Sequence, residues 1–394
     1  SSDLVRRTNT ESLTAKLLSV SDPKSPEYLQ HLSWEEAGEA FRPKKESIEA
    51  VLSWLYGAGA NAVELHPHGD IVKAELTVQQ LESATGGRFE RFTNSETGRV
   101  IDRLTGGVRV PVSVADHVDT FTGFHGFPLD EKKSQAKTGV SSAGAVTPKL
   151  INTLYNVTQV KKSGKRNIQA IAQFQGQYVS KTDLAGFCNK YEPEGKSCAI
   201  SEFHGKNQVG EPGIESMLDT EYVMGLGQGS ETWVYSYPSF DFCSDLLTFG
   251  GDLTANSTFP YSVSVSYGSQ KIDFCDSASI KRLSTSLQKA ALQGITIMIS
   301  SGDDGSGHVS RQGTNTGKVA PSYPASIPWV TAVGGTYFVS GTSGEQEATT
   351  QFGSGGGFSW DFDAPSYQTD AIKSYLSTTT LPSSSYAYAK SGRG

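Results

Sequence analysis

The sequence of 394 residues has no apolar run near the length of a membrane span. A transmembrane helix needs roughly 20 consecutive apolar residues, so an integral membrane protein is excluded. The sequence also lacks an excess of basic residues, because 34 lysines and arginines stand against 41 acidic residues and give a net charge of -7. Nucleic-acid binders carry a basic surface, so the composition predicts neither a membrane partner nor a nucleic-acid partner.

Cysteine is scarce, and none of its four residues is spaced as C-x-x-C, so a zinc or redox site of that kind is not indicated. Four cysteines permit three pairings, and proximity in the chain favours the disulfides Cys188–Cys198 and Cys243–Cys275. An even cysteine count is typical of an oxidising compartment, and the glycosylation sequons at Asn156 and Asn256 point the same way. We therefore predict a secreted glycoprotein whose signal peptide has been removed, with a lysosome or vacuole as the alternative destination.

Histidine is rare in the later part of the chain. Of seven histidines, only His204 and His308 lie beyond residue 146, and neither belongs to a recognisable triad motif. A Ser-His-Asp hydrolase is therefore unsupported, and a histidine-rich metal site is not expected.

The length allows two or three domains, at roughly 100–200 residues each. Residues 1–128 have the pattern of a small α+β domain. Ser33 and Glu36 form a capping box, and a second helix follows with apolar residues on one face from Ile48 to Leu55. Strands at 62–65 and 71–78, a helix after Thr77 and a strand at 89–92 complete the order. Helix, strand, strand, helix and strand in this order predict a ferredoxin-like domain.

Residues 129–146 mix charges with small residues and show no apolar period. Such segments are exposed and readily cleaved. The composition is equally compatible with a passive linker and with an activation site.

From residue 147 to 394 the pattern changes to alternating strands and helices. Strands are predicted at 168–174, 232–235, 262–266, 295–300 and 329–333, and helices at 181–190, 212–226 and 276–293. This alternation predicts an α/β domain with a parallel sheet and helices on both faces. Ligands of such sheets bind at the carboxyl ends of the strands.

The sharpest chemical signal is the pair Glu215 and Asp219 in the predicted helix at 212–226. Residues four apart share a helix face, and apolar neighbours surround this pair, so we expect part of it to be buried. Two carboxylates about 5 Å apart repel by ~3 kcal/mol at an effective dielectric constant of about 20, which raises their upper pKa by roughly two units. Such a pair holds one proton and suits general-base chemistry in acid. Two acids bonded to the backbone or to basic side chains would show the same spacing, so both interpretations stay open.

Two further segments follow predicted strands. Asp303 ends an apolar strand, where a protonated carboxyl could donate a hydrogen bond to an oxyanion, although a turn built from aspartate and glycine is the alternative. Ser266, Tyr267 and Gly268, and separately Gly353–Gly357, offer backbone that can pair with an extended peptide. Tight packing or a flexible loop explains the same residues.

Together these motifs resemble the sedolisins, the serine-carboxyl peptidases with a subtilisin-like fold, and most nearly their tripeptidyl-peptidase I branch. The matching segments, in chain order, are Gly213-Ile-Glu215 with Asp219 and Tyr222, Thr232-Trp-Val-Tyr235, Ser264-Val-Ser-Tyr-Gly268, Ser301-Gly-Asp303, Pro324-Ala-Ser326 with Val330-Thr-Ala-Val-Gly-Gly335, and Gly355-Gly-Gly-Phe-Ser359. Residues 1–128 resemble the inhibitory prodomain of the family, on Ser21-Asp-Pro23, Ser25-Pro-Glu-Tyr28 and His31-Leu-Ser33.

The resemblance assigns a role to each candidate. It implies that Glu215 is the general base for a serine, that Asp219 orients Glu215 and passes on its proton, and that Asp303 is the acid of the oxyanion hole. It also implies a prodomain at 1–128 that inhibits its own peptidase, an activation linker at 129–146 and a peptidase domain at 147–394. The substrate would be a peptide or an unfolded protein, bound in extended form beside Ser266, Tyr267 and Gly268.

The family's nucleophile lies in a Ser-Gly-Thr-Ser-type motif that opens a buried helix after a Gly-Arg-x-x-Pro-Asp-type stretch. This chain ends at Ser391-Gly-Arg-Gly394. We therefore expect the nucleophile, and the calcium site of the complete enzyme, to lie in a missing C-terminal segment, and we expect no metal ligands in this chain. Ser340-Gly-Thr-Ser343 has matching letters, but a polar loop follows it and it precedes the glycine-rich stretch, so Ser343 is not expected to be the nucleophile.

The main hypothesis is an acid-acting serine-carboxyl peptidase precursor that releases tripeptides from N-termini through an acyl-enzyme. Two alternatives stay open: a sedolisin-type endopeptidase, and an inert fragment or pseudoenzyme whose prodomain blocks the cleft.

Overall fold

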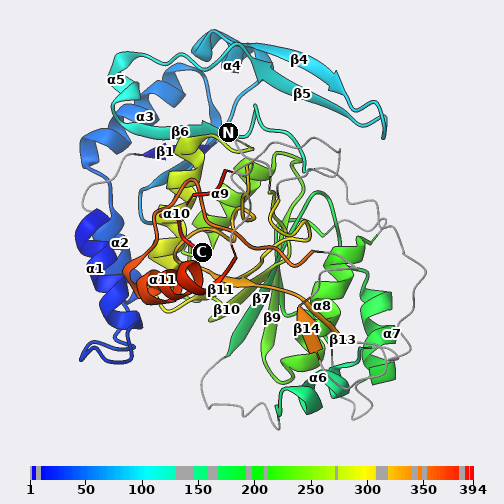
Figure 1. Cartoon of the computed structure of the whole chain (residues 1–394). Coiled ribbons are helices and arrows are strands. Elements are labelled where there is room, and N and C mark those ends of the chain that lie inside the picture. Colours follow the sequence, from blue (N-terminus) through cyan, green and yellow to red (C-terminus); the bar gives the residue numbers. More distant parts are fainter. Residues whose placement is uncertain are drawn as a thin grey trace. The chain divides into compact units, whose positions relative to one another are not determined.

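The computed structural model describes most of the chain, and its helices and strands are shown in Figure 1. The described residues are 2–5, 10–129, 146–157, 167–191, 198–207, 212–270, 274–307, 318–338, 345–347, 353–380, 387–389 and 391–394. They form two compact units. Unit 1 comprises residues 1–128, 238–259 and 275–295, and unit 2 comprises 129–237, 260–274 and 296–394. No helix among the described residues is both long and apolar enough to cross a membrane.

Unit 1 begins with the elements of the predicted α+β domain. They are β1 (Ser2–Val5), α1 (Thr10–Ser21), α2 (Trp34–Phe41), α3 (Lys45–Gly57), β2 (Asn61–Leu65), β3 (Ile71–Glu75), α4 (Val78–Thr85), β4 (Arg88–Thr93), β5 (Val100–Thr105), α5 (Val112–Ala115) and β6 (Val118–Thr122). The four-stranded sheet has the order β2-β3-β1-β6, and every neighbouring pair is antiparallel. This is the strand order of a ferredoxin-like fold, so the predicted fold class of the N-terminal domain is confirmed.

The last strand of that sheet differs from the prediction. The predicted strand at 89–92 exists as β4, but it pairs with β5 in a separate two-stranded ribbon, and β6 takes the fourth place in the sheet. β1 was not predicted, because four residues are too few to show a period. The core under the sheet is built from α3, whose Val51 and Leu55 are buried against Val72 of β3 and Val118 of β6.

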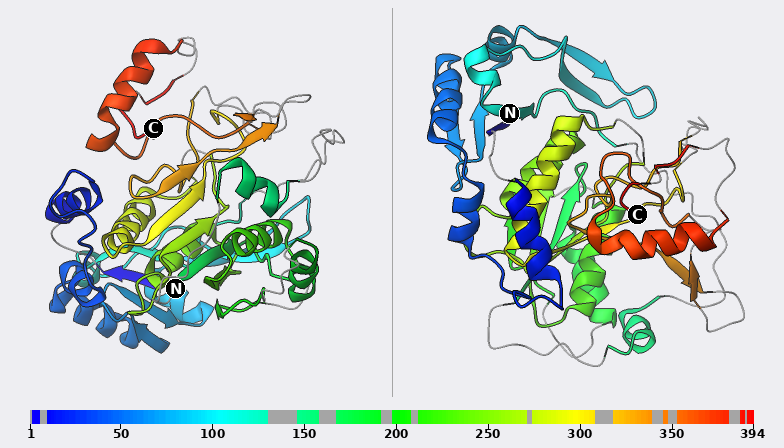
Figure 2. Two further views of the ribbon diagram at one scale, coloured as in Figure 1. Left: turned by 90° about the horizontal axis from the view of Figure 1, so that it is seen from below. Right: turned by 60° about the vertical axis from the view of Figure 1, so that its left-hand side comes forward.

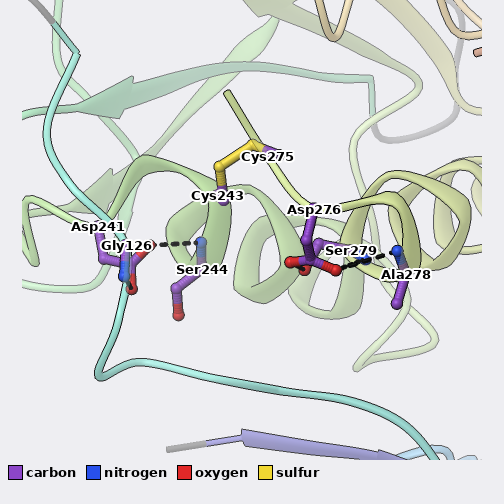
Figure 3. The surroundings of a disulfide bond; sticks show 8 residues. All are labelled: Gly126, Asp241, Cys243, Ser244, Cys275, Asp276, Ala278 and Ser279. Carbon is purple, nitrogen blue, oxygen red and sulfur yellow. Dashed lines mark hydrogen bonds between the residues drawn. A yellow bond between two sulfur atoms is a disulfide. The ribbon is translucent and has the colours of Figure 1, made fainter. Parts of the chain in front are cut away.

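Unit 1 also contains α9 (Phe242–Asp252) and α10 (Ser277–Leu292), whose residues fall in the predicted peptidase domain; α10 was predicted as a helix and α9 was not. The disulfide Cys243–Cys275 joins their N-terminal ends, as Figure 3 shows. Each helix begins at an aspartate: the Asp241 carboxylate accepts from the backbone N–H of Ser244, and the Asp276 carboxylate accepts from those of Ala278 and Ser279. Views of the chain in Figure 2 show α1 beside α10, where Gln288 Nε2 donates to Thr14 Oγ1 at 2.8 Å.

A buried ionic cluster joins the turn between β2 and β3 to α10. The Asp70 carboxylate lies 3.2 Å from Lys289 Nζ and 3.4 Å from Arg282 Nη2, and all three side chains are about 1% exposed. His66 Nδ1 lies 3.0 Å from the other oxygen of Asp70. His68, also 1% exposed, packs against Trp34 with ring centroids 4.5 Å apart and the ring planes tilted by 43°. The predicted hairpin turn therefore also supplies the main charged contact with α10.

Unit 2 is an α/β unit. Its elements are α6 (Pro148–Leu154), β7 (Ile168–Phe174), α7 (Lys181–Tyr191), β8 (Glu202–His204), α8 (Ile214–Leu226), β9 (Glu231–Tyr237), β10 (Ser262–Val265), β11 (Thr296–Ser300), β12 (Thr331–Val333), β13 (Thr336–Phe338), β14 (Glu345–Glu347), the 3-10 turn η1 (Ser366–Gln368) and α11 (Thr369–Thr378). The six-stranded sheet has the order β12-β11-β10-β7-β9-β8, and all its pairs are parallel. The predicted parallel α/β fold is confirmed.

The centre of this sheet is apolar, as expected for strands covered by helices. In β7 and β9 nearly every residue is buried. Met217 and Met224 of α8 pack against Leu184 of α7 and Val234 of β9. The disulfide Cys188–Cys198 ties α7 to the segment before β8, so both predicted pairings are confirmed.

Candidate active site

The start of α8 is tied to the carboxyl end of β7. Gly213 precedes the helix and offers no capping side chain. Its place is taken by Gln177, three residues beyond β7, whose Oε1 accepts from the backbone N–H groups of Glu215 at 3.0 Å and Ser216 at 3.2 Å. Ser216 Oγ donates to the Tyr178 carbonyl at 2.6 Å. These contacts place Glu215 at the edge of the sheet where parallel α/β folds display functional groups.

Asp219 lies one helical turn after Glu215 and is 8% exposed. Its Oδ1 accepts a hydrogen bond of 2.6 Å from Ser266 Oγ, at the carboxyl end of β10. The pKa of Asp219 is raised to about 7, mainly by burial and also by the charge of Glu215, while the Ser266 hydrogen bond opposes both. Asp219 is therefore a carboxyl group that holds its proton in acid, and Glu215 is half-buried beside it.

Tyr267 adjoins the same pair. The ring is 6% exposed and packs edge-on against Phe174, the last residue of β7, with centroids 5.2 Å apart. Burial raises the pKa of Tyr267, and the charges of Asp219 and Glu215 raise it further. Its phenol therefore stays protonated throughout the ordinary pH range.

Asp303 lies three residues beyond β11, which is the neighbour of β10 in the sheet. The register pairs Val265 with Ile299, so Ser266 and Ser300 follow at the same edge. Asp303 is half-buried, and its carbonyl accepts from the backbone N–H of Gly353 at 2.9 Å. The structure thus places Asp219 in contact with Ser266, and Asp303 one strand away at the same edge.

The glycine-rich stretch packs on the Asp303 loop. The N–H of Gly355 donates to the Gly302 carbonyl at 2.9 Å, and a Cβ at Gly355 would lie 1.7 Å from the carbonyl oxygen of Ser301. Only glycine fits at that point. Gly268 is similarly close to its neighbours, since a Cβ there would lie 2.5 Å from Ser322 Oγ. Tight packing therefore accounts for both glycines, and peptide pairing beside Ser266, Tyr267 and Gly268 stays a prediction.

The remaining predicted residues lie elsewhere or outside the described part. Asn156 and Asn256 are exposed, as a glycosylation site requires. His204 stacks on Tyr235 and lies on β8, the edge strand separated from β10 by β9 and β7. His308, Ser343 and nearly all of the 129–146 linker lie outside the described residues.

Sequence reasoning missed Gln177 and the contact of the Ser266 side chain with Asp219. Gln177 lies 38 residues before Glu215, so no local pattern signals the contact. The serine had a weak signal, because it ends a strand whose carboxyl end was already suspected.

Metal binding finds no support among these residues. Within the described ranges, no three histidine, cysteine, aspartate or glutamate side chains are grouped so that they could hold a metal ion. Calcium in the complete enzyme stays a prediction.

Comparison with known proteins identifies relatives along the whole chain. Residues 4–127 match the family described as "Pro-kumamolisin, activation domain". Tripeptidyl-peptidase 1 from Bos taurus is 36% identical over 400 residues, and the protein of that name from Homo sapiens is 35% identical over 400 residues. Each alignment covers 99% of this chain and 70% of the relative. A solved structure of Pseudomonas sedolisin, a serine-carboxyl proteinase complexed with pseudo-iodotyrostatin, is 23% identical over 60% of this chain and 68% of that chain, with a TM-score of 0.43.

The tripeptidyl-peptidase 1 proteins show the family of this chain, because their sequence identity exceeds 30% and extends over nearly all of it. The match at 4–127 coincides with the ferredoxin-like domain. The chain therefore belongs to the sedolisin family of serine-carboxyl peptidases, in its tripeptidyl-peptidase 1-like branch, and begins with the activation domain of that family.

Proposed function

We propose that the chain forms the prodomain and most of the peptidase domain of an acid-acting serine-carboxyl peptidase. The observation that carries the proposal is the buried Asp219 carboxyl, hydrogen-bonded to Ser266 and one turn from Glu215. Asp303 at the same sheet edge supplies a third acid. The groups that act on Asp219 are the Ser266 hydroxyl and the Glu215 carboxylate, so we assign proton transfer to carboxyl groups.

The proposed chemistry combines these three acids with the nucleophilic serine of a serine peptidase. Glu215 takes the serine proton as the oxygen attacks the peptide carbonyl carbon, and Asp219 orients Glu215 for this transfer. The carbonyl oxygen becomes an oxyanion, which accepts a hydrogen bond from protonated Asp303. The C–N bond then breaks, Glu215 returns the proton to the leaving amine, and an acyl-enzyme remains. Water then attacks the acyl carbonyl carbon and gives a proton to Glu215, the ester C–O bond breaks, and Glu215 returns the proton to the serine oxygen as the acid product leaves.

Acid action follows from the protonation states. Asp303 must carry a proton to act as a donor, and Asp219 retains its proton up to about pH 7. The complete enzyme is therefore expected to show a pH–rate profile with its maximum in acid. A maximum above neutrality contradicts the assignment of Asp303.

Substitution of single acids tests the roles. In the complete protein, Glu215→Gln and Asp303→Asn are each expected to lower kcat/KM by roughly 10²–10⁴-fold. Asp304→Asn is the matched control, since Asp304 is the exposed neighbour in the same turn. If Asp303→Asn and Asp304→Asn lower kcat/KM equally, the loss at Asp303 comes from a disturbed loop and not from a catalytic role.

The names of the relatives support release of tripeptides as the substrate preference. Paired peptides with a free and an acetylated N-terminus test this directly. A tripeptidyl-peptidase cleaves only the free peptide, after the third residue, whereas an endopeptidase cleaves both. A complete protein that cleaves neither peptide, and does not label with an acylating reagent, would be the inert alternative.

We also propose that residues 1–128 inhibit the peptidase until the linker is cut. The family of the activation domain supports this role. Acidification of the complete precursor is expected to produce cleavage between 129 and 146, with new N-termini mapped by mass spectrometry. A precursor that stays intact in acid while its peptidase is competent contradicts the proposal. The two disulfides further support passage through an oxidising, secretory compartment.

A further inference from the structure

The two oxygens of the Asp219 carboxyl group have different surroundings. Oδ1 accepts from Ser266 Oγ at 2.6 Å, within the range of hydrogen bonds to carboxylates. Oδ2 is buried and has no hydrogen-bond partner among the described residues. The group is thus held from one side, and its other oxygen is the one left to interact with Glu215.

Ser266 is placed by the strand that precedes it. Side chains alternate along a strand, so Ser264 and Ser266 lie on one face of β10 while Val263 and Val265 lie buried on the other. The helix that carries Asp219 is fixed to the next strand, because Gln173 Nε2 of β7 donates to the Ser216 carbonyl and to Thr220 Oγ1 of α8, each at 3.2 Å. Asp219 therefore lies on a helix fixed to β7, and Ser266 directly follows β10, the strand beside β7.

We infer that Ser266 is a positioning residue, which holds Asp219 Oδ1 as an acceptor and so makes Oδ2 the oxygen that carries the proton toward Glu215. A neutral carboxyl has one donor and one acceptor oxygen, and the serine hydroxyl decides which oxygen is the acceptor. Without it the carboxyl torsion is broad, and the proton can reside on either oxygen. The inference rests on the proposed function for its consequence, but the orientation of Asp219 is a property of this chain alone.

A role in substrate binding would give a different result. If the Ser266 hydroxyl bound the peptide, its loss would raise KM. If it positions Asp219, its loss changes the titration of Asp219 and lowers kcat.

The first experiment measures the titration of Asp219 in this chain by NMR, with ¹³C at the aspartate carboxyl carbons and Asp219→Asn to assign the resonance. Ser266→Ala is expected to raise the midpoint by roughly one pH unit, because a hydrogen bond to the charged form is lost. Ser266→Thr keeps a hydroxyl and is expected to restore it. Ser266→Cys, with a weak donor of similar size, is expected to lie between, and it serves if the alanine variant does not fold.

Two matched controls lie in the same chain. Ser264→Ala removes a half-buried serine from the same face of β10 and is expected to leave the Asp219 midpoint unchanged. Ser239 Oγ donates to Asp245 Oδ1, also at 2.6 Å, so Ser239→Ala is expected to move the midpoint of Asp245 alone. An unchanged Asp219 midpoint in both Ser266→Ala and Ser266→Cys overturns the inference.

The second experiment uses the complete enzyme. Ser266→Ala is expected to lower kcat about tenfold with KM within twofold of wild type, and Ser266→Thr is expected to recover kcat. A raised KM with unchanged kcat overturns the positioning role in favour of substrate binding. If the complete protein shows no peptidase activity, the proposed function fails, and the NMR titration still decides whether Ser266 orients Asp219.

Discussion

Each unit contains a pair of carboxylates four residues apart on one helix or at its start. The two pairs differ in the contacts of the carboxylate that comes first in the chain. In unit 2, Asp219 follows Glu215 by four residues and binds Ser266 at 2.6 Å. In unit 1, Asp245 follows Asp241 by four residues and binds Ser239 at 2.6 Å. Burial raises the pKa of both Asp219 and Asp245 to about 7.

The first carboxylate separates the two pairs. Asp241 is the N-cap of α9 and accepts from the backbone N–H groups of Ser244 at 3.1 Å and Gly126 at 3.0 Å, which Figure 3 shows around the disulfide. Its oxygens are occupied by the backbone, with Arg103 bonded to the carbonyl of Phe240 nearby. At α8, the side chain of Gln177 accepts from the first backbone N–H groups, so Glu215 does not have to cap the helix. Spacing alone therefore does not separate a pair that caps its helix from a pair whose first carboxylate is left free of that task, and the capping contacts do.

The largest expected effect concerns the second carboxyl of each pair. A folded-state pKa of about 7, against an ordinary value of 3.8, means that stability is fully present below pH 3.8 and falls as pH rises to 7. Over that pH range, each of the two groups lowers the free energy of unfolding by about 4 kcal/mol at most. Asp219→Asn and Asp245→Asn should each flatten this fall, as measured by urea unfolding at several pH values. If neither substitution alters the pH dependence of the free energy of unfolding, the two pairs do not share a buried, protonated second carboxyl.

The next effect concerns the first carboxyl. Asp241→Ala removes a helix cap and leaves the N–H of half-buried Gly126 without its acceptor, so it should lower the free energy of unfolding by roughly 2–4 kcal/mol. Glu215→Ala should lower it by about 1 kcal/mol or less, because the cap of α8 is supplied by Gln177 and stays in place. Asp276→Ala at α10 is the cap-only comparison and should lower it by about 1 kcal/mol. Equal losses at Asp241 and Glu215, from denaturant midpoints at pH 5, would contradict the distinction.

The smallest expected effect comes from His68 in unit 1. It lowers stability as pH falls, whereas Asp219 and Asp245 lower stability as pH rises. The pKa of His68 is lowered to about 3. Burial is the largest cause, the charges of Lys289, His66 and Arg42 act in the same direction, and the charge of Asp70 opposes them. Both ring nitrogens are buried without a hydrogen-bond partner in the described part of the chain. Stability from this group is present above pH 6.5 and is lost as pH falls toward 3.

His68→Phe removes that titration and keeps a ring against Trp34. The variant should match wild type at pH 7.5 and exceed its unfolding free energy by about 2 kcal/mol at pH 5. Hydrogen exchange of the β2–β3 turn and of α10 locates the effect. His125→Phe, at an exposed histidine, is the control and should change neither the unfolding free energy nor the hydrogen exchange. If the His68 variant loses stability in acid as steeply as wild type, the acid sensitivity belongs to another titratable group.

Much of the fold was predictable from local patterns. The apolar face of α3, the capping box at Ser33 and the buried runs of β7 and β9 each act over a few residues, and all appear as elements in the structure. The disulfides were predictable because their cysteines are only 10 and 32 residues apart. β1 and the place of β6 in the sheet were not, because pairing between distant strands leaves little trace in either strand alone.

The sequence by itself determined the parallel α/β pattern, the ferredoxin-like order and the placement of Glu215 and Asp219 on one helix face, because periodicity and capping are local. Only the tertiary structure decided which buried acid meets a hydroxyl and which acid caps a helix. Ser266 reaches Asp219 across 47 residues, and Arg282 reaches Asp70 across 212. Burial sets the protonation of these groups, and burial is a property of the packed chain, since it depends on which distant segments exclude water from the same place.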